Sequence, residues 1–177
     1  MITSEARERL RGWFTGRLPE EWQAEQPEIT VDREEITVVL HLPDVELPES
    51  AGDAERAEAR AGRAKAFREE TRERRVGIAR EAEHRYDRKV SWGVVLGAGE
   101  EPHRELFTHI AAPVMTRLRQ PERLVLDTLV DAGVARSRAD ALAWCVRLVG
   151  RHEGDWLAEL REAMGAVADV RRKGPAA

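Results

Sequence analysis

The chain has 177 residues, of which 42% are hydrophobic and 35% are charged, and its formal net charge at pH 7 is −4. This length can bury one or two small cores, and no apolar run is long enough to cross a bilayer. The charged, amphipathic start, Met1–Leu10, argues against a signal peptide. The single Cys145 excludes an internal disulfide, and no Cys/His spacing typical of zinc occurs. We therefore expect a cytoplasmic protein.

The charge is unevenly distributed. Residues 1–105 carry 18 Lys and Arg against 24 Asp and Glu, a net of −6, whereas residues 106–177 carry 11 against 9, a net of +2. The basic surplus therefore lies in the C-terminal part, and because it is small it gives only a weak electrostatic footprint for nucleic-acid binding.

The N-terminal part alternates helical and strand patterns. A helix is expected from Thr3 or Ser4 to about Phe14, and two alternating runs within 29–42, separated by the polar turn DREE, predict a hairpin. Helical spacing follows over 76–86, with Val76, Ala79, Ala82 or Glu83, and Tyr86 on one face. A strand over 90–96 then completes a small ββαβ-like layer, one sheet covered by one helix.

The Ala-, Glu- and Arg-rich stretch 49–75 admits three interpretations. It fits a solvated helix with ion pairs three and four residues apart, or in part a disordered linker. An arginine-rich RNA-binding helix is the third interpretation, and it is disfavoured because acids nearly cancel the arginines.

The segment 98–105 is the expected linker, because two glycines, a proline and polar residues follow one another there. The predicted organisation is an acidic N-terminal α+β module at 1–100, a second domain at 106–172 and a disordered tail at 173–177. A set of carboxylates and imidazoles falls at this linker, and their irregular spacing favours a solvated loop over a metal site: Glu100, Glu101, His103, Glu105 and His109.

The stretch 114–151 carries the most specific pattern. Val114, Thr116 and Leu118 alternate with Met115, Arg117 and Arg119, which predicts a short strand with one face on a core. Pro121 then stops the strand and presets the first turn of a helix. Gly133 fits the C′ position after that helix, and Ser137 with Asp140 resembles a capping box at the start of a second helix.

This order of strand, helix, corner and helix resembles the ribbon-helix-helix (MetJ/Arc) superfamily, on the residues TRLRQPE and AGVARSRADAL. Gln120 departs from that pattern, which usually has an apolar residue before the proline. The resemblance implies a homodimer whose two strands pair as an antiparallel ribbon in the DNA major groove. It implies base contacts by Met115, Arg117 and Arg119, and a phosphate held by the amides around Ser137 and Arg138. The side chains of Arg136 and Arg138, on either side of Ser137, could bind that phosphate or serve surface solubility alone.

The sequence therefore predicts an α+β fold. It consists of the ββαβ-like N-terminal module, a βαα dimerisation unit and an extra terminal helix. The leading hypothesis is a sequence-specific DNA-binding regulator whose N-terminal module binds a small-molecule or protein effector. The alternative is a non-catalytic assembly protein that uses the ribbon for dimerisation alone. In that case Arg117 and Arg119 lie on the solvent-exposed face of an edge strand, where their charge discourages aggregation. No catalytic motif, phosphate loop or cofactor site occurs in the sequence, so we expect no enzyme and no cofactor.

Overall fold

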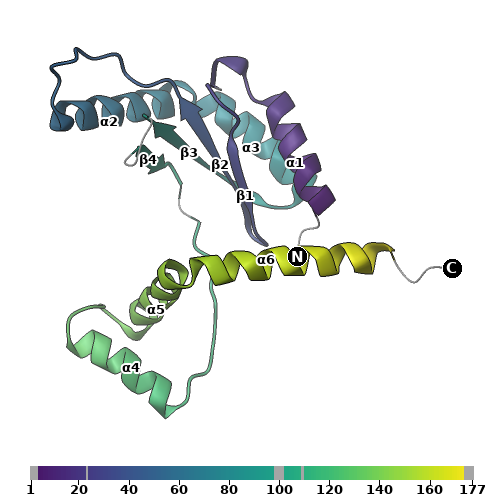
Figure 1. Ribbon diagram of the computed structural model, residues 1–177, viewed down its shortest axis with the longest axis vertical. Helices are drawn as coiled ribbons and strands as arrows, with labels where there is room; N and C mark the ends of the chain where they lie inside the picture. Colours follow the sequence, from purple (N-terminus) through teal and green to yellow (C-terminus); the bar gives the residue numbers. More distant parts are fainter. Residues whose placement is uncertain (1–3, 23, 98–101, 109, 174–177) are drawn as a thin grey trace. The chain divides into compact units, whose positions relative to one another are not determined.

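The computed structural model describes residues 4–22, 24–97, 102–108 and 110–173. The chain forms two compact units, Met1–Ala112 and Pro113–Ala177, which are shown in Figure 1. The division falls after the predicted linker at 98–105, because His103–Leu106 forms a strand of the N-terminal sheet. The predicted tail 173–177 lies, apart from Lys173, outside the described residues.

Unit 1 is an α+β layer, as the sequence predicts for the fold class. Its described elements are α1 (Ser4–Arg17), the short 3-10 helix η1 (Glu20–Trp22), β1 (Glu28–Val31), β2 (Glu35–Leu42), α2 (Asp53–Glu70), α3 (Arg72–Tyr86), β3 (Lys89–Leu96) and β4 (His103–Leu106). The strand order is β1-β2-β3-β4, in which β2 and β3 are parallel and both outer pairs are antiparallel. Helices α2 and α3 form the crossover that a parallel pair requires.

Alternation along β2 and β3 places one face of the sheet against the helices. Ile36, Val38, Leu40 and Leu42 of β2 face the same core as every second residue of β3 from Val90 to Leu96. Phe14 of α1 and Trp22 of η1 both meet the Trp92 ring edge-on, with centroids 6.4 Å apart in each pair. The aromatic residues therefore join the N-terminal segment to the sheet.

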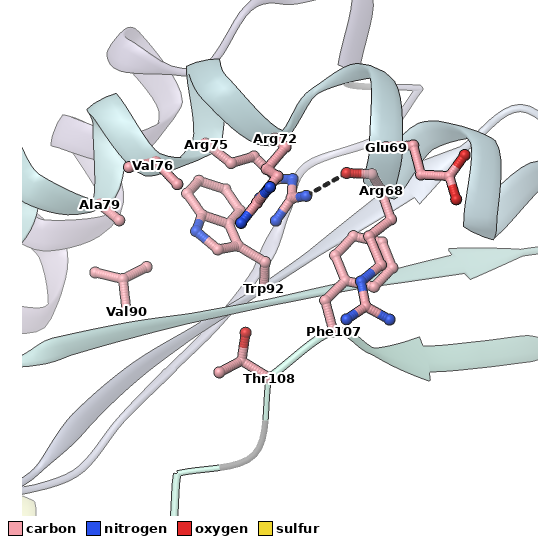
Figure 2. A pocket seen from close by; sticks show the side chains of 10 residues that line it. All are labelled: Arg68, Glu69, Arg72, Arg75, Val76, Ala79, Val90, Trp92, Phe107 and Thr108. Carbon is pink, nitrogen blue, oxygen red and sulfur yellow. Dashed lines mark hydrogen bonds between the residues drawn. The ribbon is translucent and has the colours of Figure 1, made fainter.

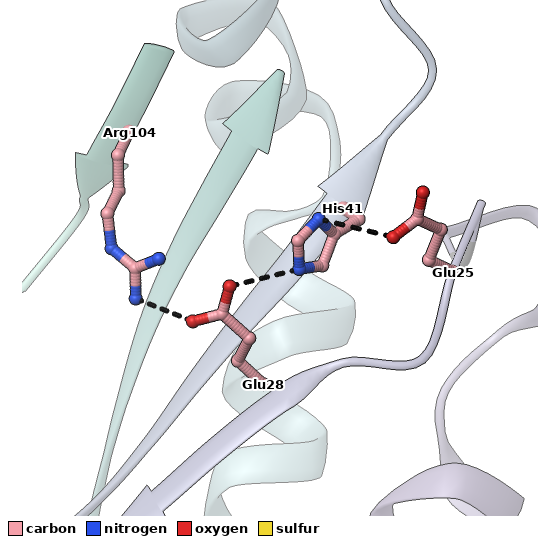
Figure 3. A network of polar contacts seen from close by, with 4 residues as sticks. All are labelled: Glu25, Glu28, His41 and Arg104. Carbon is pink, nitrogen blue, oxygen red and sulfur yellow. Dashed lines mark hydrogen bonds and ion pairs between the residues drawn. The ribbon is translucent and has the colours of Figure 1, made fainter. Parts of the chain in front are cut away.

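The opposite face carries a polar bridge across all four strands, shown in Figure 3. The Nη2 group of Arg104 on β4 donates to Glu28 Oε2 on β1 at 2.9 Å, and His41 Nε2 of β2 lies 3.1 Å from Glu28 Oε1. The side chains that cross β2 and β3 leave Val39 and Val95 buried beneath them. Gly93 is required here, because an added Cβ would lie 2.6 Å from the Leu106 side chain and 2.8 Å from the Glu105 carbonyl oxygen.

Two interpretations of the helical region need correction. The stretch 49–75 contributes to the core rather than lying wholly in solvent, because Ala64 and Phe67 of α2 are buried. In α3 the predicted stripe is confirmed at Ala82, which is buried, and at Ala79 and Tyr86, which pack against the core. It is wrong at Val76, which is 41% exposed, because the first turns of α3 face the core with Arg75 and Ile78 instead.

Unit 2 contains α4 (Gln120–Asp131), α5 (Arg138–His152) and α6 (Gly154–Lys173). Pro121 lies in the first turn of α4, and Gly133 follows that helix with φ of 74°; both agree with the sequence prediction. Ser137 caps α5, since its hydroxyl accepts a hydrogen bond from the Asp140 amide at 3.2 Å. The buried core among the described residues of this unit is small: Leu126, Ala135 and Ala141, with partly buried apolar residues packed against it, Leu118, Leu129, Val130, Leu142 and Cys145.

The described helices include none that has both the length and the apolar character needed to cross a membrane.

Candidate functional site

The candidate nucleic-acid interface begins with the extended segment 113–119. Within the single chain this segment forms no strand, and Val114 is 85% exposed rather than turned to a core. The predicted strand is therefore wrong for this chain, because no described segment pairs with 113–119 to supply the hydrogen bonds of a ladder. Of the three residues expected to face a core, Leu118 does pack against one. Met115 is 97% exposed, and Arg117 and Arg119 are exposed as well.

The start of α5 contributes the second group of predicted residues. Arg136, Ser137 and Arg138 are all exposed there. Asp127 of α4 accepts two hydrogen bonds from Arg138, from Nε at 2.6 Å and from Nη2 at 2.7 Å. These bonds lower the pKa of Asp127 and raise that of Arg138. The Arg138 guanidinium is therefore occupied within the chain.

The cap of α5 also involves a carboxylate. Asp140 Oδ2 accepts from the Arg136 amide at 3.0 Å, and this backbone hydrogen bond, with the Arg136 charge, lowers the pKa of Asp140. Ser137 Oγ accepts from the Asp140 amide, so the reciprocal pattern of a capping box is met one residue earlier than usual. A phosphate at this helix start would have to share the site with the Asp140 carboxylate.

Among the described residues, no hydrogen bond or ion pair links the group at 115–119 to the group at 136–138. Each group belongs to unit 2, and each presents exposed arginine. Arg117 and Arg119 make no ion pair with any described residue, so their guanidinium groups are free to bind an external acceptor.

A second site, in unit 1, was not predicted from the sequence. A cavity of about 310 Å³ lies between α2, α3 and β3, and Figure 2 shows the side chains that line it. Three arginines gather on it, Arg68, Arg72 and Arg75, beside the rings of Trp92 and Phe107. Arg75 is 7% exposed and its Cζ lies 4.9 Å from the Phe107 ring centroid.

The sequence held a signal for this site. Arg68, Arg72 and Arg75 are spaced i, i+4 and i+7, which places them on one helical face. The neighbouring glutamates made that face resemble a solvated surface of balanced charge. Of the predicted linker set, His103 and Glu105 lie on β4 with His103 Nε2 3.7 Å from Glu105 Oε2, whereas Glu100, Glu101 and His109 lie outside the described residues. No group of three such side chains comes together among the described residues as a metal would require.

Fold and sites together define a two-unit α+β protein, with an arginine-lined cavity in the sheet unit and exposed arginines in the helical unit. The sequence supports the same division. Residues 8–102 match the family model of the Rv1265-like protein, N-terminal domain, and residues 119–171 match the Mb1296 C-terminal domain. The chain therefore belongs to the Rv1265-like family. The second match begins at Arg119, so Met115 and Arg117 precede it.

Relatives of known sequence agree with this assignment. The uncharacterized protein Mb1296 of Mycobacterium bovis is 63% identical over 163 residues, covering 92% of this chain and 69% of that protein. The uncharacterized protein Rv1265 of Mycobacterium tuberculosis has the same identity and coverage. No solved structure matches the chain.

Proposed function

We propose that this protein is a sequence-specific DNA-binding regulator of the cytoplasm that acts as a homodimer. In this proposal the segments 113–119 of two copies pair as an antiparallel ribbon and enter the major groove. The observation that carries it is the exposure of Met115, Arg117 and Arg119 on an extended, unpaired segment that leads directly into the proline-started helix α4.

The sparse core of unit 2 supports a second copy. Among the described residues of this 65-residue unit only three hydrophobic residues are buried, and domains of this size need a larger core or a partner. Apolar side chains remain exposed on α4 and α5: Leu124, Val125, Val146 and Val149. Each is about half exposed, so moving it out of water would contribute about 1 kcal/mol.

The chemistry of the exposed segment fits base recognition. Arginine can donate two hydrogen bonds to the major-groove edge of guanine, and the methionine side chain can pack on a thymine methyl group. The net charge of +2 over residues 106–177 adds a modest attraction to phosphate.

The competing function is a protein-assembly unit that binds no DNA. The pairing of Arg138 with Asp127 and the position of the Asp140 carboxylate favour it, since both reduce the capacity of the α5 start to bind phosphate. In that case the ribbon serves dimerisation, and the N-terminal unit carries the function.

The test is selection of DNA from a random library by the full chain, followed by affinity measurements with Arg117→Ala/Arg119→Ala. Each bidentate arginine–guanine contact is worth about 1–3 kcal/mol, and the dimer presents four such arginines. The double variant should therefore lose about 4 kcal/mol or more, roughly 1,000-fold in affinity for the selected site. The molar mass from light scattering should stay that of the wild-type dimer.

A matched control removes the same charge elsewhere in unit 2. Arg151→Ala/Arg161→Ala alters two exposed arginines of α5 and α6, and it should retain most of the affinity. Equal losses in both variants would mean nonspecific charge attraction. A dimer that enriches no sequence would favour the assembly function.

A further inference from the structure

We propose that the cavity between α2, α3 and β3 binds a small anion with a flat apolar body, such as an aromatic carboxylate or phosphate. Its negative group would lie against Arg68, Arg72 and Arg75, and its apolar part against Trp92 and Phe107 (Figure 2). This inference does not depend on DNA binding, because all of its residues belong to unit 1.

The three guanidinium groups have no carboxylate partner among the described residues. Neither Arg68, Arg72 nor Arg75 makes an ion pair with any residue that the structure describes, although other arginines of α2 and α3 do, such as Arg60 with Asp44 and Arg74 with Glu21. In Figure 2 the Glu69 carboxylate at the rim points away from the three arginines. Unneutralised positive charge thus converges on one cavity.

Arg75 is held in place for an external acceptor. Its Nε donates to Thr71 Oγ1 at 2.9 Å, and its Nη2 donates to the Arg68 carbonyl oxygen at 2.6 Å. Among the described residues no acceptor bonds to Nη1, so two of its five N–H donors are still available on that nitrogen. The Thr71 hydroxyl itself donates to the Phe67 carbonyl oxygen at 2.6 Å, which fixes the junction between α2 and α3.

The local electrostatics disfavour an empty site. Burial, and then the charges of Arg68 and Arg72, lower the pKa of Arg75 to about 10. The group remains protonated at neutral pH, where it bears the cost of both desolvation and like-charge repulsion. A bound anion would reduce that cost, because it supplies opposite charge and accepts the spare N–H groups.

The apolar walls of the cavity determine the shape and size of the uncharged part of the ligand. Trp92 and Phe107 are nearly buried, and the Phe107 ring is fixed by the guanidinium of Arg75 at 4.9 Å and that of Arg68 at 5.7 Å. Val76, Ala79 and Val90 complete the apolar lining. A volume of about 310 Å³ lies at the lower end of small-molecule pockets.

A small ligand fits this site better than a nucleic-acid backbone. Arg75 lies at the base of a concave site and is 7% exposed, whereas a polynucleotide bound across the helices would contact the outer arginines alone. The net charge of −6 over residues 1–105 also opposes a polyanion.

The test is calorimetric titration of the full chain with phenyl phosphate and with inorganic phosphate at constant ionic strength. We expect one saturable site for phenyl phosphate, with tighter binding than for inorganic phosphate. Arg72→Gln should weaken it about tenfold, because it removes a charge-assisted hydrogen bond. Val76→Phe should weaken it similarly with the charge unchanged, because the larger side chain fills the cavity.

Arg80→Gln is the matched control, since it removes an exposed arginine of α3 that does not line the cavity; its affinity should equal that of the wild type. Tryptophan fluorescence and the melting temperature of each variant verify the fold. Absence of saturation with phenyl phosphate would overturn the inference, as would equal loss in Arg72→Gln and Arg80→Gln. A third outcome would also overturn it. If phenyl phosphate does not bind but an oligonucleotide does, and Arg72→Gln abolishes that binding, the cavity region binds nucleic acid instead.

Discussion

Replacing Asp127 by asparagine should strengthen DNA binding. Asp127 accepts two short hydrogen bonds from the Arg138 guanidinium at the start of α5, of 2.6 and 2.7 Å. Asparagine lacks the charge that holds this pair, so Arg138 would be released to contact a phosphate. Because the same bonds lower the pKa of Asp127, the carboxylate stays ionised at neutral pH, and a modest fall in pH cannot produce this release.

The expected size follows from two added phosphate contacts, one in each copy of the dimer. Each contact steepens the dependence of log affinity on log salt by about 0.9. Between about 50 and 200 mM salt, the variant should therefore lose roughly tenfold more affinity than the wild type. Fluorescence anisotropy with the selected DNA at several salt concentrations measures the slope.

Two variants isolate the cause of this gain. Asp131→Asn, on the same helix, changes the charge equally without releasing Arg138, and its slope should stay at the wild-type value. Arg138→Gln in the Asp127→Asn background should abolish the gain. An unchanged slope in Asp127→Asn would refute the assignment of the α5 start to phosphate binding.

The remaining predictions concern stability. Gly93→Ala should destabilise unit 1 by about 1–3 kcal/mol, because the new Cβ would meet a backbone oxygen at 2.8 Å. Gly62→Ala should instead stabilise it by about 0.5–1 kcal/mol, because that helical site has nothing within 4 Å of the new Cβ. Urea unfolding followed by fluorescence measures both changes in the free energy of unfolding. Ser137→Ala should cost about 0.5–2 kcal/mol through loss of the α5 cap, measured by thermal circular dichroism, whereas an aspartate there should retain the cap. The hydrogen bond from Arg104 lowers the pKa of Glu28, so this bridge stabilises the fold above the ordinary glutamate pKa and is lost as the pH falls through the lowered value. Melting temperatures over about pH 3–6 should therefore fall less steeply for Glu28→Gln than for the wild type, and identical slopes would contradict the bridge.

Elements that are stabilised by residues close in sequence were predicted correctly. The cap at Ser137 and the left-handed Gly133 depend on one or two residues each, and both were predicted at the correct positions. The strands over 29–42 and 90–96 follow from alternating apolar residues, since one face of the sheet packs on helices.

Elements that depend on distant partners were missed. Strand β4 is four residues long and largely polar, and it exists because it pairs with β3 next to Gly93. The inward turn of Arg75 depends on the helix break at Thr71 and on the Phe107 ring, 32 positions further along the chain. The i, i+4, i+7 spacing of Arg68, Arg72 and Arg75 indicates a shared helical face, but no local pattern predicts that this face lines a cavity closed by Trp92 and Phe107.

The segment 113–119 differs from both cases. Its alternation indicates a strand, but the hydrogen bonds of a two-stranded ribbon come from a second chain.

Cysteine scanning across the segment tests the central proposal most directly. In a Cys145→Ser background, single cysteines are placed from Val114 to Leu118 and oxidised at low protein concentration. In an antiparallel ribbon, directly opposed residues have Cα atoms about 4.5–5.5 Å apart, which is within disulfide range. We predict efficient linkage at one position near the two-fold axis and a steep fall on either side of it, because the two copies of a residue move apart by about 7 Å per step along the strands. A dimer linked at Val114, Thr116 or Leu118 should keep its DNA affinity, whereas cysteine at Met115 or Arg117 removes a base contact. Uniformly inefficient linkage, or a monomer at every concentration, would contradict the ribbon and the DNA-binding function built on it.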